Sequence, residues 1–230
     1  MARDDPKPTR RDRQRVRTRA ALIEAAQQLI AEGRQNVAVL EITQLADVGL
    51  GSFYNHFGSK DQLYEAALRD VLDRLGAVLD GLTVDLDDPA EIFAQSFRLT
   101  GRLFRRYPQL SRVLLRSGID LIQADVGLAP RVRRDIDAGA AAGRFHIPDT
   151  DLAVTLAAAA ILALGALLES QPDRDDGPAA DATAASLLQV FGVPRDEATA
   201  ICRAPLPALD ALAPIAAGDR RLSGSTAETA

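Results

Sequence analysis

Residues 39–57 read VLEITQLADVGLGSFYNHF, and this stretch decides the fold. Its apolar spacing predicts two short helices, one over 39–46 and one over 50–56, with only a tight turn between them. Asp47 stands in that turn, and aspartate tolerates a left-handed backbone better than most residues do. Two short helices joined this closely form a helix-turn-helix, whose second helix can lie in the major groove of DNA.

Apolar side chains within the same stretch predict a small core. Ile42, Leu45 and Ala46 give the first short helix an inward face. Val48 and Phe53 are expected to cover that core from the turn and from the second helix.

Helices are also expected on both sides of this motif. Thr18 can cap a helix that runs to about Glu32 and stops at Gly33. After the motif, Ser59 and Gln62 have the spacing of a capping box that opens a helix to about Leu82. That helix would be roughly 34 Å long, at 1.5 Å per residue, which is enough to join two domains.

The motif resembles a known family. The pair Thr18-Arg19, the run from Ala46 to Phe57 and Lys60 closely resemble the DNA-binding domain of TetR-family transcriptional regulators, over about residues 15–66. The resemblance implies an all-α homodimer with an N-terminal three-helix DNA-binding domain and a larger helical ligand-binding and dimerisation domain. It implies a repressor that binds a palindromic operator in double-stranded DNA and is released by a small-molecule effector.

This chain departs from the family pattern at a few positions. Ala38 and Gly49 stand where the family usually has a capping Ser or Thr, while Thr43 and Asp47 replace the usual Ala and Gly. A missing side-chain cap costs about 0.5–2 kcal/mol, so the motif is expected to be locally soft. None of the four departures removes a DNA-facing group.

Lys60 has a physical argument of its own. It is expected in the first turn of a helix, where the macrodipole disfavours a cation by about 0.3–1 kcal/mol. A bound phosphate explains that placement, because a helix N-terminus attracts the same anion. The side chains expected at DNA are Arg17, Thr18, Arg19, Leu50, Gly51, Ser52, Tyr54, Asn55, His56 and Lys60.

Those residues divide by the contacts that they can make. Ser52 and Asn55 can bond base edges or phosphates, and Leu50 can contact a thymine methyl. Arg15, Arg17 and Arg19 would add phosphate or minor-groove contacts. The alternatives are a structural role for His56, a packing role for Tyr54, and a solvated basic tail for the other N-terminal cations.

The charge distribution agrees with a DNA-binding N-terminus. Residues 1–19 carry eight cationic and three acidic side chains, a net charge of +5. The whole chain carries −5, so residues 20–230 carry −10. A basic end on an acidic body is the asymmetry expected when one end meets a polyanion.

The chain is expected to form two domains with flexible ends. The predicted parts are a flexible basic arm over 1–14, the DNA-binding domain over 15–62, the ligand-binding and dimerisation domain over 63–215 and a disordered tail over 216–230. In the second domain, helices are predicted at 89–107, 108–117, 119–125, 129–142, 150–170, 179–191 and 195–203.

The helix predicted after Pro89 is amphipathic. Arg98, Arg102, Arg105 and Arg106 fall opposite its apolar face and are expected in solvent. Ser96 and Thr100 project from the apolar side, where they either bond back to their own helix or orient a ligand. The residues expected in a ligand pocket are Phe93, Ser96, Phe97, Thr100 and Phe104.

Residues 152–168 are apolar at every helical angle, which exceeds the need of one small core. A helix that faces its own core on one side and a partner subunit on the other has this composition; the alternatives are a central helix of a monomer and a membrane span, which usually needs about 20 residues. The expected homodimer interface comprises Ala158, Ile161, Gly165, Leu168, Leu187 and Val190.

Several function classes are disfavoured. The chain has one Cys and two His, so neither an internal disulfide nor a His/Cys zinc site is expected. It has no nucleophile-elbow, P-loop or dinucleotide-binding motif, so we expect no enzyme, no cofactor and no metal. Met1 to Arg19 lacks the apolar run of a secretory signal, and a cytoplasmic location is expected. The competing class is an interaction module that uses the same helical dimer without regulating transcription.

Overall fold

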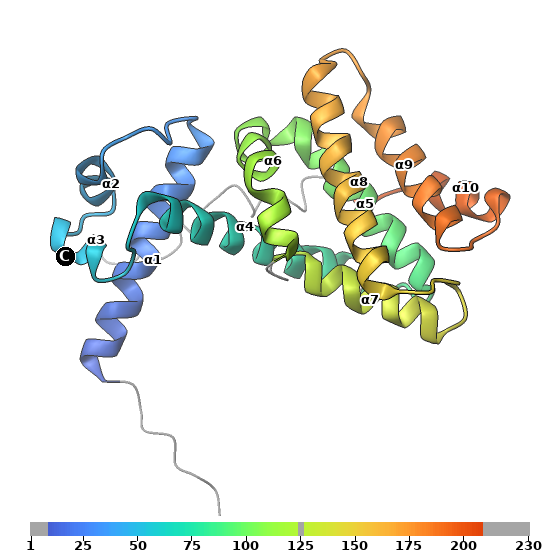
Figure 1. The fold of residues 1–230 in the computed structure, drawn as a ribbon, viewed down its shortest axis with the longest axis horizontal. Coiled ribbons are helices and arrows are strands. Elements are labelled where there is room, and N and C mark those ends of the chain that lie inside the picture. The colour runs from blue at the N-terminus through green and yellow to red at the C-terminus, as the bar shows by residue number, and fades with distance from the viewer. Residues whose placement is uncertain (1–8, 124–126, 209–230) are drawn as a thin grey trace, which may run out of the picture. The chain divides into compact units, whose positions relative to one another are not determined.

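The computed structural model describes residues 9–123 and 127–208, and there the chain is all-α with ten helices and no strand (Figure 1). The fold class predicted from the sequence is therefore confirmed. The chain divides into two compact units between Leu68 and Arg69. That division falls inside α4, which spans Lys60–Leu82.

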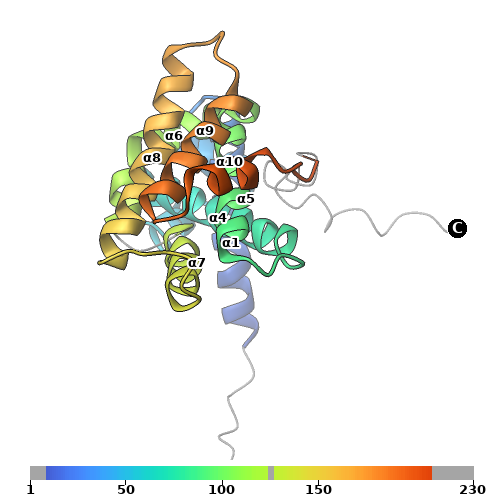
Figure 2. The ribbon, with the colours of Figure 1, turned by 90° about the vertical axis from the view of Figure 1, so that its right-hand side faces the viewer.

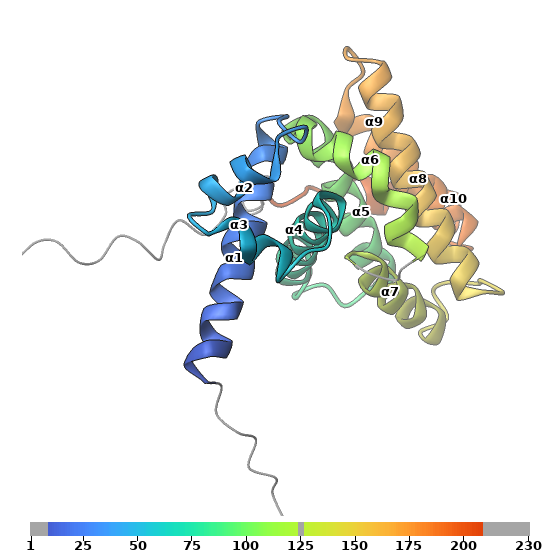
Figure 3. The same ribbon diagram turned by 60° about the vertical axis from the view of Figure 1, so that its left-hand side comes forward.

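The first unit contains α1 (Arg10–Ala31), α2 (Val39–Leu45), α3 (Leu50–Tyr54) and the start of α4 (Figure 3). Phe53 is completely buried beneath these helices, together with Leu22, Leu29, Ile42 and Leu63. Leu45 does not join this core, contrary to the sequence prediction: its side chain is 41% exposed. The buried residues of α2 are Ile42 and Thr43. Successive residues of a helix are about 100° apart, so Leu45 points about 200° from Thr43 and faces solvent.

The first helix begins earlier than the sequence pattern predicted. Thr9 is its N-cap: the Thr9 hydroxyl oxygen accepts from the backbone N–H of Asp12, and the Asp12 carboxylate accepts from that of Thr9. This capping box makes Arg10 the first helical residue, so Thr18 is not a cap. Residues 10–14, predicted as part of a flexible arm, are helical, while residues 1–8 lie outside the described part. The predicted tail over 216–230 also lies outside it.

The turn between α2 and α3 has the predicted backbone. Asp47 has a φ of 53°, in the left-handed region. The N-cap residues Ala38 and Gly49 provide no side-chain hydrogen bond to either helix. The two predicted missing caps are therefore confirmed.

The second unit is arranged around α5 (Pro89–Arg106), which packs against each helix from α6 to α10. The others are α6 (Pro108–Gln123), α7 (Ala129–Ala141), α8 (Thr150–Ser170), α9 (Asp176–Val190) and α10 (Arg195–Arg203). Figure 2 shows α9 between α8 and α10. The helices predicted at 108–117 and 119–125 form one helix as far as Gln123, and residues 124 and 125 lie outside the described part. Gly118, at the predicted break, stays helical, because a glycine inside a helix costs only about 1 kcal/mol.

Arg98 is buried, contrary to the prediction that it lies in solvent. Its side chain is 6% exposed, and its Nε donates to the Asp181 carboxylate at 2.8 Å. A second nitrogen donates to the carbonyl of Ala204 at 2.9 Å. The reason is the close approach of α9: Gly101 on α5 lies against Ala180, leaving no room for a Cβ, and this contact brings Asp181 over the arginine side of α5.

Asp88 provides a first test of the fold. It caps α5 by accepting from the N–H of Ala90, and it accepts two hydrogen bonds from Arg144 at 2.9 and 2.8 Å. The Arg144 bonds, with the Ala90 N–H, hold the pKa of Asp88 below its ordinary value of 3.8. Asp88→Ala should therefore reduce the free energy of unfolding by about 1–2 kcal/mol at pH 7, measured by urea denaturation.

The pH dependence and the neighbouring residue supply the controls. Because the folded-state pKa is depressed, the contribution is present above about pH 4 and is lost as the pH falls through the folded-state value. The difference in the free energy of unfolding between wild type and Asp88→Ala should therefore become smaller in acid. Asp87→Ala should change stability by less than about 0.5 kcal/mol, since that side chain is exposed. Equal losses for the two variants would contradict the role of Asp88.

Candidate DNA-binding surface and ligand cavity

Helix α3 presents polar and small groups on the side opposite its buried residue. Phe53 is fully buried, whereas Leu50 is 46% and Tyr54 61% exposed. Gly51 and Asn55 are exposed, and Ser52 and His56 are partly exposed. The residues predicted to meet DNA thus share an accessible surface around α3, which is what base and phosphate contacts require.

Basic residues of α1 adjoin the end of α3. Burial lowers the pKa of His56, and the nearby charges of Arg15 and Arg19 lower it further. The Arg19 guanidinium lies 5.3 Å from the centre of the Phe57 ring. Two α1 arginines therefore extend the surface of α3, where they can meet phosphate oxygens.

The other predicted N-terminal residues are also on α1. Arg17 and Arg19 are exposed and Thr18 is partly exposed. Because α1 begins at Arg10, these arginines belong to an ordered helix rather than to a loose arm. A helical arginine loses less freedom on binding than one in a flexible segment does.

Lys60 has a partner within the protein. Its Nζ donates to the carbonyl of Val37 at 2.8 Å. Ser59 accepts from the N–H of Gln62, and the Gln62 side chain accepts from the N–H of Gly58, so the start of α4 is capped. The lysine at this helix start is thus explained without a phosphate, and its contact with DNA stays a prediction.

The second unit contains a cavity of about 120 Å³ that is partly open to the surface. Its walls are mostly apolar and come from α4, α5, α6, α7, α8 and the segment before α7. Phe93, Ser96, Phe97 and Thr100 line it, as the sequence predicted. The remaining apolar lining is Leu72, Leu79, Leu114, Leu128, Ala129, Val132, Val154, Ala157, Ala158, Ile161 and Leu162.

Thr100 combines the two roles that the sequence left open. Its hydroxyl donates to the carbonyl of Ser96 at 2.8 Å, and both residues line the cavity. Phe104 does not line this cavity, contrary to the prediction. Its ring packs directly against Gly165 of α8, in space that only a glycine leaves free.

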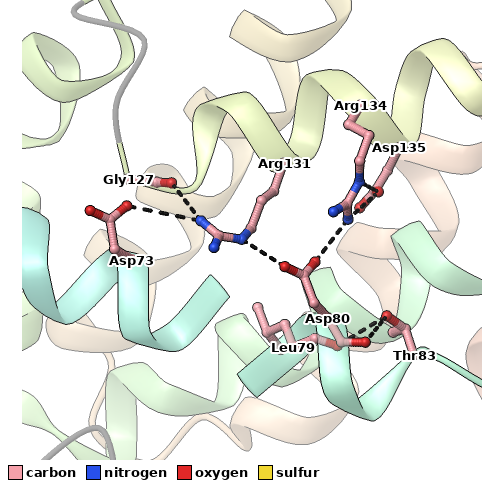
Figure 4. Close-up of polar contacts among 8 residues, drawn as sticks. All are labelled: Asp73, Leu79, Asp80, Thr83, Gly127, Arg131, Arg134 and Asp135. Carbon is pink, nitrogen blue, oxygen red and sulfur yellow. Dashed lines mark hydrogen bonds and ion pairs between the residues drawn. The ribbon is translucent and has the colours of Figure 1, made fainter. Parts of the chain in front are cut away.

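Charged residues that the sequence did not predict line one part of the cavity. Figure 4 shows their polar contacts with one another. We define the polar end as Asp80, Arg131 and Asp135, all of which line the cavity. Arg131 Nε donates to Asp80 at 3.0 Å, and Arg134 donates to both Asp80 and Asp135. A signal existed, since residues 131 and 135 are four apart and share one face of a predicted helix.

The two carboxyl groups of the polar end differ in their electrostatics. Burial raises the pKa of Asp80, but hydrogen bonds from Arg134 and Arg131 outweigh it, so the net pKa lies below the ordinary value. For Asp135 burial is the larger effect and raises the pKa, although the Arg134 hydrogen bond opposes it. The polar end therefore contains one firmly ionised carboxylate and one whose charge is poorly solvated.

Comparison with known proteins identifies the family. Residues 22–67 match the family described as bacterial regulatory proteins, tetR family, and residues 88–204 match the tetracyclin repressor-like C-terminal domain. The chain belongs to the TetR family. The resemblance stated from residues 15–66 is thereby confirmed and extended to the second unit.

Curated HTH-type transcriptional repressors match part of the chain. The HTH-type transcriptional repressor KstR2 of Mycolicibacterium smegmatis is 36% identical over 84 residues, which are 34% of this chain and 41% of KstR2. The HTH-type transcriptional repressor Rv3405c of Mycobacterium tuberculosis is 36% identical over 88 residues, 38% of this chain and 44% of that protein. The matched region thus spans less than half the length of these curated relatives.

A solved structure matches almost end to end. The crystal structure of RolR in complex with the ligand resorcinol is 36% identical in sequence, with a TM-score of 0.67. The match covers 86% of this chain and 98% of the RolR chain. This TetR-family chain therefore shares both units with a regulator whose structure contains a bound small molecule.

The predicted dimer residues of this TetR-family chain require correction. Gly165, Leu168 and Leu187 are buried in the protomer's own core, and Ala158 and Ile161 line the cavity. Val190 is 61% exposed, and Ala158 and Ile161 are partly exposed. The sequence indicated that α8 has two apolar faces, but the predicted α8 residues Ala158, Ile161, Gly165 and Leu168 lie on the side that packs within the protomer, against α5, α6 and α7.

The opposite faces of α8 and α9 are exposed and apolar. We define the α8/α9 face as these exposed residues: Leu152, Leu156, Ala159, Ala163, Ala166, Leu167 and Val190. Among the described helices, α8 is also the one long and apolar enough to cross a membrane, with 33% of that window buried in the protein. An exposed apolar face of this kind can be covered by a second protein surface as well as by lipid.

Proposed function

We propose that this chain is a ligand-responsive transcriptional repressor that binds a palindromic operator as a homodimer. The observation that carries the proposal is the combination, within a TetR-family chain, of an exposed α3 surface bordered by α1 arginines and a separate apolar cavity. A surface for DNA and a cavity for a small molecule are the two sites that ligand-dependent repression requires.

The homodimer is proposed to form through the α8/α9 face. Leu152, Leu156 and Leu167 are large apolar side chains left in solvent by the protomer. A second copy of the same face would bury them in a symmetric four-helix contact, which suits the small alanines between them. Two copies also supply the two recognition helices that a palindrome needs.

The effector is proposed to occupy the cavity of the second unit. RolR, which this chain resembles over most of its length, was crystallised with resorcinol, a one-ring compound. Helix α4 contributes Leu72, Leu79 and Asp80 to the cavity, and its first residues belong to the DNA-binding unit. A ligand that changes the position of α4 would therefore alter the DNA-binding unit that the same helix enters.

The domain limits follow from this assignment. We propose that the DNA-binding domain ends within the first turns of α4, between Gln62 and Leu68, and that the ligand-binding and dimerisation domain continues to about residue 215. A repressor of this kind acts in the cytoplasm and carries out no catalytic reaction itself.

The direct test is an electrophoretic mobility shift with DNA from upstream of the chain's own gene. The proposal expects sharp, salt-sensitive retardation of this DNA and much weaker retardation of a random duplex. Equal retardation of both DNAs would instead favour a loosely binding interaction module.

Asn55 and Arg17 should separate sequence readout from backbone contact. Asn55→Ala should reduce the ratio of specific to random affinity by about tenfold, because a good base contact contributes about 1–3 kcal/mol. Arg17→Ala should weaken binding to the two DNAs by similar factors. It should also lower the slope of log affinity against log salt concentration by about one unit. Fluorescence anisotropy at several salt concentrations measures both quantities, and uniform weakening by Asn55→Ala would place that residue among the phosphate contacts.

Ser96→Trp should fill the cavity and block the response to the effector. Ser96 lines a cavity of about 120 Å³, which is too small for an indole and a ligand together. The variant should stay folded and dimeric while its operator affinity no longer changes when ligand is added. A wild-type ligand response in the folded variant would show that the effector binds elsewhere.

A further inference from the structure

The second unit contains a second pocket along the helices that line the ligand cavity. This pocket has a volume of about 240 Å³ and is partly open to the surface. Its lining comes from the end of α5, the start of α6 and the C-terminal part of α8. The ligand cavity, of about 120 Å³, is lined by the same three helices and by others. The two spaces therefore lie one after the other between α5, α6 and α8.

About one helical turn separates the two spaces. On α5, Thr100 lines the cavity and Phe104 lines the second pocket. On α8, Ile161 lines the cavity and Gly165 lines the second pocket. Four residues of an α-helix span about 6 Å. A barrier of this thickness can be formed by a single large side chain.

The ring of Phe104 lies at this barrier. The side chain is 7% exposed and lines the second pocket without lining the cavity. Aromatic side chains of a helix lean back over the residues three and four positions earlier, which directs this ring toward Thr100. The ring also packs against the backbone of α8, since a Cβ added at Gly165 would lie 2.3 Å from a ring carbon. Phe104 thus spans the gap from α5 to α8 between the two spaces.

The second pocket suits a hydrocarbon chain. Leu115 and Leu168 provide apolar lining beside the Phe104 ring. The Ser111 hydroxyl donates to two backbone carbonyls at the end of α5, and Arg105 donates to two carbonyls that follow α8. Arg112 pairs with an α8 carboxylate at 3.4 Å. Because these polar groups have partners within the protein, the apolar lining is what the pocket offers to a ligand.

Resting on the proposed function, we propose that Phe104 determines the length of the ligand. Its ring separates the cavity from the second pocket and confines the effector to the cavity. Removal of the ring joins the two spaces, and a ligand with an apolar chain then occupies both. Phe104 is therefore a specificity-determining residue that excludes long ligands.

Isothermal titration of the full chain with resorcinol and 4-hexylresorcinol tests this role. The two probes share one ring, and the second carries a hexyl chain that exceeds the cavity. Wild type should bind resorcinol about tenfold more tightly than 4-hexylresorcinol. Phe104→Ala should bind 4-hexylresorcinol about tenfold more tightly than wild type does, because the chain is buried in the second pocket. Its affinity for resorcinol should stay within about threefold of wild type.

Three results would overturn the proposal. The first is equal affinity of wild type and Phe104→Ala for 4-hexylresorcinol. The second is a wild type that binds 4-hexylresorcinol as tightly as resorcinol. The third is binding of neither probe to either protein.

Leu99→Ala is the matched control. Leu99 is completely buried on the same helix and lines neither the cavity nor the second pocket. This variant should not gain affinity for 4-hexylresorcinol, and an equal gain would mean that loosening of the core admits the chain. If Phe104→Ala does not fold, as judged by circular dichroism, Phe104→Leu takes its place and should change the two affinities in the same directions.

Operator binding, measured separately, keeps the two proposals distinguishable. A wild-type chain that binds its operator but accepts 4-hexylresorcinol as readily as resorcinol retains the proposed function and loses this inference. A Phe104→Ala chain that shows the predicted gain, in a protein with no preference for its operator, retains the role of Phe104 and loses the proposed function.

Discussion

Leu156→Glu should convert the homodimer into a monomer and lower operator affinity by at least about 100-fold, or roughly 2.8 kcal/mol. Leu156 is 43% exposed in the first half of α8, in the α8/α9 face. In the proposed dimer the substitution would bury two carboxylates beside each other in an apolar contact, which costs several kcal/mol unless they are neutralised. A monomer places only one recognition helix on the palindrome and loses the advantage of two linked half-sites.

Sedimentation velocity measures the oligomeric state, and fluorescence anisotropy with operator DNA measures the affinity. Val84→Glu is the matched control, since Val84 is a 74% exposed apolar residue between α4 and α5, outside the α8/α9 face. The control should leave both the dimer and the affinity unchanged. A Leu156→Glu protein that remains dimeric would show that the subunits associate through another surface.

Arg98→Ala should produce the largest loss of stability, about 3 kcal/mol. The side chain is 6% exposed and joins α5 to α9 through Asp181 and to the end of α10 through the carbonyl of Ala204. Its removal leaves a void and takes one donor from the Ala204 carbonyl, although Arg102 still contacts Asp181 at 2.8 Å. The retained contact keeps the expected loss at the lower end of the range for a broken buried ion pair.

Urea denaturation followed by circular dichroism provides the measurement. Arg195→Ala is the control, because Arg195 is exposed at the start of α10, and it should cost less than about 0.5 kcal/mol. A loss below about 1 kcal/mol for Arg98→Ala would mean that the guanidinium is solvated in solution.

Local patterns predicted the helix-turn-helix well. The positions of α2 and α3, the left-handed Asp47 and the buried Phe53 all follow from residues within one short stretch. The start of α1 was predicted wrongly because basic residues obscured its apolar period, and the capping box at Thr9 was overlooked.

Contacts between distant helices could not be predicted in the same way. Arg98 lies opposite the apolar face of α5 when that helix is considered alone, yet α9 covers it. Likewise α8 has two apolar faces, and only the packing of α5 against one of them shows which remains exposed. The polar end of the cavity joins Asp80 to residues on α7 some fifty positions later, and no single helix pattern contains both.

Ligand-dependent repression is tested most directly by one anisotropy titration with a labelled duplex from upstream of the chain's own gene, repeated with saturating resorcinol, the ligand in the RolR crystal structure. The proposed repressor should bind this duplex at least 100-fold more tightly than a random one, with steep salt dependence. If the cavity binds the effector as proposed, resorcinol should then weaken the specific binding by about 5–150-fold, the usual range for coupling between two sites. Binding that does not distinguish the two duplexes, or specific binding that resorcinol does not change, would contradict the proposed ligand-responsive repressor.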